Sequence, residues 1–250
     1  MKLLFIFLLV GTFLTSLEWP STTSTKVLTE PIRVEAGETY DGFAENGGKW
    51  VKYERGISGL GDCTNVNGGM NDAVFILESN SRLKNVILGP NSIKYVYCIG
   101  EGCIIENVWW EDSCREAVII EGSSKNTVKF RITGGGARNG RSNIVQHNSD
   151  GAVQINSFYV ENSKQLYSSC ENCETGYQGR RSALIYKVTA SNVETLVGYN
   201  ANYRDKISLL DVKFTGKHVC KMLEGNNEGK EARFLGYKCE STSISRCFCD

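Results

Sequence analysis

The sequence predicts an all-β protein, a single-domain right-handed parallel β-helix, and three observations favour this fold class. Short apolar segments recur at regular intervals, no long stretch places its apolar residues every 3.6 positions, and glycine, asparagine and serine separate the segments. One coil of a β-helix has this pattern, with two or three short strands in roughly 20 to 30 residues. A β-sandwich ranks second, because its strands are joined by tight hairpin turns that are not evident here.

The first series of strands recurs at a constant step. Residues 73–78, 95–100 and 117–122 are rich in β-branched and aromatic side chains, and they begin 22 residues apart. Equivalent strands of successive coils should therefore pair in parallel and stack their inward side chains into one core. Later members of this series are residues 144–148, 195–199 and 219–224.

A second series alternates apolar and polar positions and lies between members of the first. Its members are residues 83–88, 103–109, 127–133, 153–160 and 207–214. Asn85 and Asn107 occupy the same position in consecutive coils, so their side chains are expected to hydrogen-bond to each other along the axis at a turn.

The N-terminus resembles a secretory signal peptide. Met1 and Lys2 form a short basic start, residues 3–10 are apolar and residues 11–16 supply small residues suited to cleavage. The apolar run is shorter than the roughly 20 residues of a membrane-spanning helix. We therefore expect a signal peptide at about residues 1–18, a mature domain at residues 19–250, and an extracellular location with no membrane partner.

Cysteine content and charge limit the remaining classes. The chain has ten cysteines, an even number that favours disulfides in an oxidising compartment, although their spacing leaves the connectivity open. Cys170 and Cys173 could form a redox pair, but a structural bridge or two separate bridges is favoured. The 28 basic residues balance the 28 acidic ones, so bulk charge selects no nucleic acid as a partner, and a monomer is expected.

Several sequence words carry a family resemblance. The most specific are Asn107-Val-Trp-Trp-Glu-Asp112, Gly134-Gly-Gly-Ala-Arg-Asn139 and Gln146-His-Asn148, and similar words run from Trp19 through most of the chain. They closely resemble the class III pectate lyases, which are polysaccharide lyase family 3. The resemblance implies a secreted parallel β-helix that cleaves de-esterified pectin, polygalacturonate, by β-elimination with Ca²⁺ as cofactor.

The resemblance also implies an arginine base. The segment from Cys170 to Arg181 is similar to the family segment that ends in the catalytic arginine, which makes Arg180 the best match and Arg181 the next. Because the pKa of arginine is normally above about 12, alkaline working conditions are expected. Arg138 and Arg141 could supply a cation that the family carries as lysine where this chain has Asn143.

The calcium site departs from the family pattern. The resemblance places Lys94 and Arg115 at two positions where the family has acids, and only Glu116 keeps its carboxylate. Glu111 and Asp112 match the family and are alternative calcium ligands, since Ca²⁺ prefers oxygen ligands. Calcium is not expected to bind in the usual way, and Glu121 stands where the family has another lysine.

Two principal hypotheses follow for polygalacturonate as partner. In the first, the chain is a lyase in which Lys94 and Arg115 neutralise the uronate carboxylate, and Arg138 and Trp110 also contact the sugar. In the second, the chain is a catalytically impaired pectin-binding or host-interacting protein. A third reading is a structural β-helix with a protein partner. His147 is expected to have a structural hydrogen-bonding role.

Overall fold

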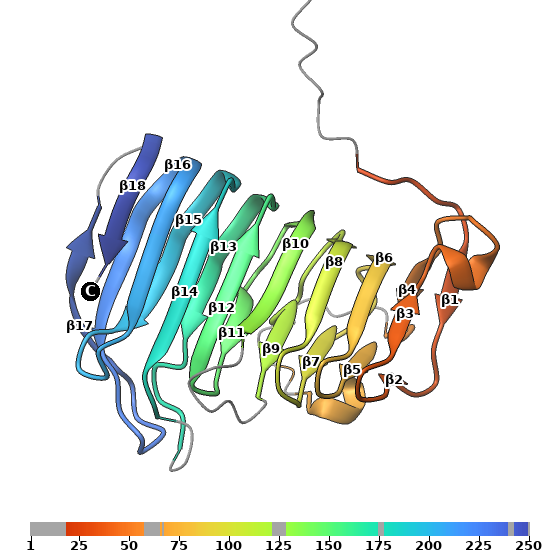
Figure 1. Cartoon of the computed structure of the whole chain (residues 1–250), viewed down its shortest axis with the longest axis horizontal. Helices are drawn as coiled ribbons and strands as arrows, with labels where there is room; N and C mark the ends of the chain where they lie inside the picture. The colour runs from red at the N-terminus through yellow and green to blue at the C-terminus, as the bar shows by residue number, and fades with distance from the viewer. Residues whose placement is uncertain are drawn as a thin grey trace, which may run out of the picture.

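Short strands wind around a single axis in stacked coils, from β1 at one end to β17 and β18 at the other (Figure 1). The computed structural model describes residues 19–57, 66, 68–121, 129–174, 178–239 and 243–249. Its fold is the predicted right-handed parallel β-helix, and the predicted signal peptide lies outside the described residues. None of the helices within these residues has the length and apolar character needed to cross a bilayer.

Three parallel sheets run along the axis. Sheet I contains β2 (Ile32–Val34), β5 (Phe75–Leu77), β7 (Val96–Cys98), β9 (Val118–Ile120), β11 (Asn143–His147) and the later parts of β13 (Tyr159–Ser169), β15 (Thr189–Asn200) and β16 (Lys206–Glu224). Sheet II contains β3 (Thr39–Asp41), the early parts of β6 (Arg82–Leu88), β8 (Ile104–Trp110) and β10 (Lys129–Arg138), then β12 (Gly151–Asn156), β14 (Arg181–Tyr186) and the start of β16.

Sheet III and the end of the solenoid complete the fold. Sheet III contains β1 (Thr25–Val27), β4 (Lys52–Glu54), the later parts of β6, β8 and β10, the early parts of β13 and β15, and the middle of β16. Two 3-10 turns, η1 (Ala44–Asn46) and η3 (Met70–Asp72), lie in the connections. The last strands, β17 (Arg233–Lys238) and β18 (Ser243–Cys249), pair antiparallel with β16.

The repeat seen in the sequence sets the strand register. Val96 of β7 pairs with Val118 in the next coil, 22 residues later, so the step seen in the sequence is one coil. The preceding pairing is one residue shorter, because Val96 pairs with Phe75, 21 residues earlier. A sandwich is excluded, because the pairings are parallel throughout the described strands apart from those of β17 and β18. The fold prediction is therefore confirmed, and the predicted 22-residue register of the first series holds between β7 and β9 but is shifted by one residue between β5 and β7.

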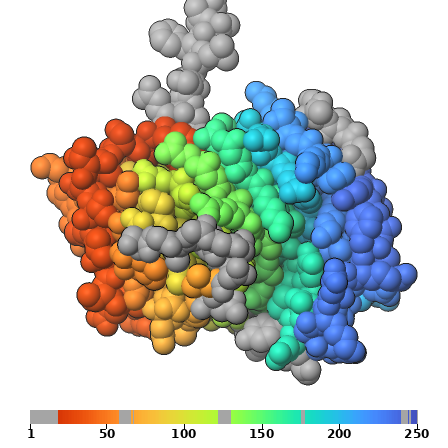
Figure 2. Space-filling model, turned by 180° about the vertical axis from the view of Figure 1, so that it is seen from behind, coloured from red at the N-terminus to blue at the C-terminus, as the bar shows by residue number. Residues whose placement is uncertain are grey.

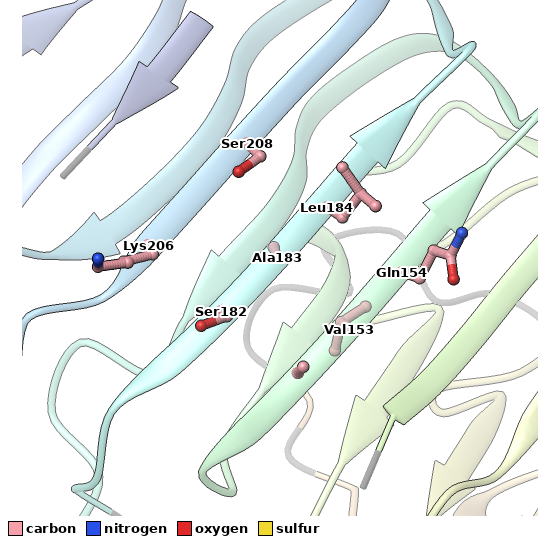
Figure 3. A pocket seen from close by; sticks show the side chains of 8 residues that line it. Val153, Gln154, Ser182, Ala183, Leu184, Lys206 and Ser208 are labelled. Carbon is pink, nitrogen blue, oxygen red and sulfur yellow. The ribbon is translucent and has the colours of Figure 1, made fainter. Parts of the chain in front are cut away.

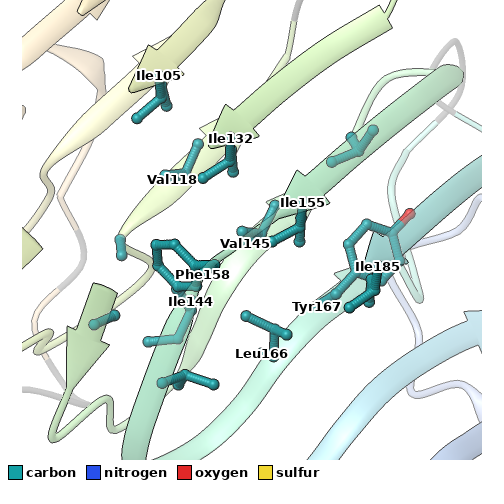
Figure 4. Packing of buried hydrophobic residues seen from close by; sticks show 14 of the residues in the cluster. Ile105, Val118, Ile132, Ile144, Val145, Ile155, Phe158, Leu166, Tyr167 and Ile185 are labelled. Atoms are coloured by element: carbon teal, nitrogen blue, oxygen red, sulfur yellow. The ribbon is translucent and has the colours of Figure 1, made fainter. Parts of the chain in front are cut away.

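The core is a set of stacked apolar columns between the sheets. On sheet II, Ile105, Ile132, Ile155 and Ile185 follow one another coil by coil (Figure 4). All four are buried. Full burial of one such side chain stabilises the fold by about 1.5–3 kcal/mol. Successive coils therefore pack closely, and the space-filling view shows them as adjacent bands from red to blue along the molecule (Figure 2).

Asparagine stacking at the bend between sheets II and III is confirmed. Asn107 Nδ2 donates to Asn85 Oδ1 over 2.8 Å, and Asn85 Nδ2 donates to Asp41 Oδ1 over 2.9 Å. Both asparagines have positive φ, 54° at Asn85 and 52° at Asn107. Asparagine tolerates this left-handed conformation better than most residues, so one residue type both turns the chain and joins consecutive coils.

Disulfides connect neighbouring parts of the coils. The structure contains the bridges Cys98–Cys103, Cys170–Cys173, Cys220–Cys249 and Cys239–Cys247, and Cys114 is also disulfide-bonded. The described part of the chain has no free cysteine. Cys170 and Cys173 are bonded to each other, so of the alternatives left open by the sequence the structure has a single bridge across this short loop.

Candidate active site

An ion pair on the outer side of sheet I joins two residues that are one coil apart. The Lys94 ammonium contacts the Glu116 carboxylate, and Ser142 Oγ donates to Glu116 Oε1 over 3.1 Å. Lys94 is only 8% exposed. Burial by itself would raise the pKa of Glu116, but the Lys94 charge and the hydrogen bonds that the carboxylate accepts hold this pKa below its usual value. The pair is thus a neutralised, nearly buried unit.

Further acidic groups surround this pair. Burial raises the pKa of Glu121, opposed by a hydrogen bond from Asn148 and by the charge of Lys94. Burial also raises the pKa of Tyr97, and the negative charges of Glu121 and Glu116 raise it further. Lys94 therefore serves as the counter-ion within an acidic cluster and is not a cation that projects freely toward solvent.

The carboxylates proposed as metal ligands are all engaged with cations. Besides the pair of Glu116 with Lys94, Glu111 Oε2 lies 2.7 Å from Lys52 Nζ. Asp112 Oδ2 lies 3.9 Å from Arg141 Nη2. Within the described ranges, the one close grouping of potential ligand atoms is Cys220, Cys239 and Cys249, and these are disulfide-bonded. A hard divalent cation such as Ca²⁺ does not fit these residues, because it would have to displace an ammonium or a guanidinium.

The doubled arginine divides into a buried and an exposed member. Arg181 has 0% exposure, and its guanidinium donates to the carbonyl oxygens of Ser149 and Asn148 and to Gln178 Oε1. Burial lowers the pKa of Arg181, and the nearby charge of Asp205 opposes that effect. Arg181 therefore fixes the loop before β14 and cannot contact a substrate without unfolding this loop.

Arg180 is exposed and lies over a hollow on the outer face of sheet II. The hollow has a volume of about 590 Å³ and is lined by Asp150, Gly151, Ala152, Arg180 and Ser182. No side-chain hydrogen bond or ion pair joins Arg180 to another residue in the part of the chain that the structure describes. Its guanidinium is thus available to a ligand in the hollow.

The predicted site residues fall into three separate places. Lys94 and Glu116 lie just before β7 and β9 of sheet I, whereas Arg180 lies over sheet II. Arg115 is half-buried and its Nε donates to the Val66 carbonyl oxygen over 3.1 Å. The remaining cations flank sheet III, where the Arg138 guanidinium lies 4.5 Å from the centre of the Trp19 ring and Arg141 lies near Asp112.

The prediction that Trp110 contacts sugar is wrong. Trp110 is fully buried and its ring packs edge to face against Phe158, with centroids 6.2 Å apart. Side chains of a strand alternate between faces, so Trp109 points outward, but the Trp19 ring lies 4.8 Å from it and Trp109 is only 5% exposed. Neither ring offers a free face for stacking.

Lys206 is a candidate that reasoning from sequence did not identify. It lies on the outer face of sheet II in register with Ser182, which in turn pairs with Ala152. Two small residues at equivalent positions of consecutive coils were a signal for a depression in the surface. The signal could not be used, because the phase of the coils after residue 122 is irregular in the sequence.

His147, the last residue of β11 in sheet I, is buried in the core. It has 0% exposure, and its Nδ1 lies 2.9 Å from the Tyr167 hydroxyl. Burial lowers the pKa of His147 to about 3, and the positive charge of Arg181 adds to this effect. His147 is therefore neutral and structural, in agreement with the role favoured from the sequence.

The buried histidine predicts how stability depends on pH. The folded protein keeps His147 neutral down to about pH 3, while the unfolded chain protonates it below its usual pKa of 6.5. The unfolded state binds more protons in this interval, so the free energy of unfolding should rise with pH by up to about 1.4 kcal/mol per unit and then level off. Urea unfolding of His147→Gln should show a smaller slope, and His218→Gln, which changes the other histidine, should keep the wild-type slope. Equal slopes in all three proteins would contradict this prediction.

Comparisons with known proteins agree with this fold. A family model described as "Pectate lyase" matches residues 16–230. "Probable pectate lyase E" of Aspergillus clavatus is 45% identical over 183 residues, which cover 72% of this chain and 68% of that relative. "Pectate lyase E" of Emericella nidulans is 40% identical over 216 residues, 86% of this chain and 78% of that relative.

Solved structures show a similar fold at lower identity. The catalytic domain of pectate lyase PelI from Erwinia chrysanthemi has a TM-score of 0.68 and 23% identity, covering 85% of this chain and 93% of that domain. PelI in complex with tetragalacturonic acid has a TM-score of 0.64 and 23% identity, covering 85% of this chain and 67% of that one. At 23% identity, this similarity shows a shared fold and no more.

Proposed function

The chain belongs to the pectate lyase family, and from this premise we propose that it cleaves de-esterified pectin, polygalacturonate, by β-elimination outside the cell. The observation that carries the proposal is the position of Arg180, whose exposed guanidinium lies over a hollow of about 590 Å³. The relatives named pectate lyase supply the reaction class, and the position of Arg180 supplies a group that can act in it.

The chemistry assigns Arg180 the role of base. In β-elimination the base takes the proton from C5 of a galacturonate, the C5–H electrons form the C4–C5 double bond, and the C4–O glycosidic bond breaks. The leaving oxygen then takes a proton from water. Charge develops next to the carboxylate, so a nearby cation lowers the barrier. Because only a neutral guanidine accepts a proton and its pKa is normally above about 12, activity should increase toward alkaline pH.

Calcium is the cofactor expected for the family, but the residues of this chain do not accommodate it at the expected position. The Lys94 ammonium lies against Glu116, where the resemblance expects a metal ligand set, and Arg115 adds a second positive charge. A bound cation would be repelled by these side chains, since two positive unit charges 4 Å apart repel by roughly 1 to 4 kcal/mol at effective dielectric constants of 80 to 20. The proposed lyase therefore works without calcium at this cluster.

Chelation tests this point. Formation of unsaturated products from polygalacturonate, followed by ultraviolet absorbance, should be unchanged within about twofold when EDTA replaces added calcium. The physical reason is that Lys94 already supplies the positive charge at the acidic cluster. A calcium-dependent pectate lyase serves as the control that EDTA is effective. Loss of product in EDTA and recovery with calcium would contradict the proposal.

A second candidate function is pectate binding without cleavage, and one structural observation favours it. The outward column that continues from Lys94 and Glu116 along sheet I consists of Asn143, Gln165, Thr195 and His218. Asn143, Gln165 and Thr195 have uncharged side chains, and Lys94 is already paired with Glu116. This column therefore offers no free lysine that could act in catalysis. Retention on immobilised polygalacturonate with no unsaturated product across alkaline pH would select this function over the lyase.

We further propose membership of class III and secretion as a monomer, with a signal peptide near residues 1–18 and a mature domain at residues 19–250. The words Asn107-Val-Trp-Trp-Glu-Asp112 and Gly134-Gly-Gly-Ala137 support the class. The disulfide bridges support an oxidising, extracellular location. Mass spectrometry of the secreted protein would locate the mature N-terminus.

A further inference from the structure

A second hollow continues from the Arg180 hollow across the outer face of sheet II. It has a volume of about 280 Å³ and is lined by residues of β12, β14 and β16 (Figure 3). The two hollows share Ala152 and Ser182, so together they form one groove across three strands. We call it the sheet II groove.

Strand register explains the shape of this groove. One outward column is Ala152, Ser182 and Lys206, and the next is Gln154, Leu184 and Ser208. Alanine and serine leave the floor low, while Gln154, Leu184 and Lys206 project from it (Figure 3). Neighbouring strands lie about 4.8 Å apart, so a ligand extended along the solenoid axis follows these two columns and meets the residues of a new strand at each such step.

The groove is bordered by cations. Arg180 and Lys206 are exposed, and within the described residues neither has an ion-pair partner. Arg131, also exposed, extends the same face, because it pairs in register with Gln154. Asp150 is the one carboxylate among the lining residues. Since the whole chain has no net charge, this is a local excess of positive charge.

We propose that the sheet II groove binds consecutive uronate units of an acidic sugar chain, with Lys206 as a carboxylate-binding residue next to Arg180. The choice of a polyuronate rests on the proposed function. Gln154, Ser182 and Ser208 provide amide and hydroxyl groups that suit sugar hydroxyls, and the cations suit carboxylates. The groove thus combines both recognition chemistries of a galacturonate chain on one sheet face, apart from the Lys94 and Glu116 pair.

Binding of trigalacturonate to the intact protein tests the proposal independently of cleavage. Isothermal titration calorimetry at low ionic strength should show about tenfold weaker affinity for Lys206→Ala, equivalent to about 1.4 kcal/mol. Ser182→Trp, which fills the floor, should abolish binding, and its thermal unfolding checks that the fold is intact. The matched control is Lys164→Ala, an exposed lysine on β13 outside the groove, which should keep wild-type affinity.

The outcomes separate this inference from the proposed function. Trigalacturonate that binds with the same affinity to wild type, Lys206→Ala and Ser182→Trp would overturn the groove while leaving lyase activity possible elsewhere. Equal affinity of wild type for single-stranded DNA would overturn the choice of an acidic sugar. Affinity that depends on Lys206 in a protein that yields no unsaturated product would support the groove and reject the lyase.

Discussion

Arg181→Ala is expected to destabilise the protein by more than about 4 kcal/mol, whereas Arg180→Ala is expected to change stability by less than about 0.5 kcal/mol. The guanidinium of Arg181 is buried and donates to the carbonyl oxygens of Ser149 and Asn148. Its removal leaves buried acceptors without donors and opens a large cavity. Arg180 projects into solvent over the hollow and makes no comparable contacts in the described structure.

The same two variants should have the opposite order of effect on catalysis. Loss of a general base typically lowers the rate by about 10² to 10⁴, so Arg180→Ala should lose unsaturated product while its unfolding curve stays unchanged. Arg181→Lys keeps a charge but not the planar set of donors, so it should recover only part of the stability. Urea unfolding and the ultraviolet lyase assay on the same preparations measure both quantities. A stable Arg181→Ala protein, or an active Arg180→Ala protein, would reverse these assignments.

The sequence alone could not predict which of the two adjacent arginines is buried. The resemblance placed functional interest on the adjacent arginines without deciding which of them faces outward. In strands, neighbouring side chains point to opposite faces, so an error of one position exchanges a buried role for an exposed one. The same uncertainty explains Trp110, which was predicted to contact sugar and instead packs in the core against Phe158.

Other features were predictable because the early coils are regular. Lys94 and Glu116 are separated by 22 residues, the step of the first strand series, so the repeat alone places them side by side. The same step brings Asn85 to Asn107. After residue 122 the coil length changes, and sequence alone could not show that Arg180 lies over sheet II, with Lys206 in the next coil.

The ion pair on sheet I provides the second large expected effect. Lys94→Met should destabilise the protein by about 3 kcal/mol, because it leaves the Glu116 carboxylate nearly buried without its counter-ion. The side chains of Lys94 and Glu116 are 10% and 15% exposed, so solvent can compensate little of this loss. For a domain of this size the melting temperature should fall by roughly 6 to 12 °C.

A double variant distinguishes the pair from its members. Lys94→Met combined with Glu116→Leu removes both charges and should recover most of the lost stability, because two apolar side chains can replace a buried ion pair with little net cost. The difference between the double variant and the sum of the single variants gives the coupling energy. A double variant as unstable as Lys94→Met would show that the lysine stabilises the fold through other contacts.

The pH dependence of this coupling gives an independent check. Because the folded pKa of Glu116 is lowered from its usual value of 4.5, the contribution of the pair is complete above that value and is lost as pH falls through the folded pKa. The instability of Lys94→Met relative to wild type should therefore diminish in acid, where a protonated Glu116 no longer needs a counter-ion. If the difference persisted at a pH well below 4.5, Lys94 would act through packing, and the argument that its charge takes the place of a metal ion would fail.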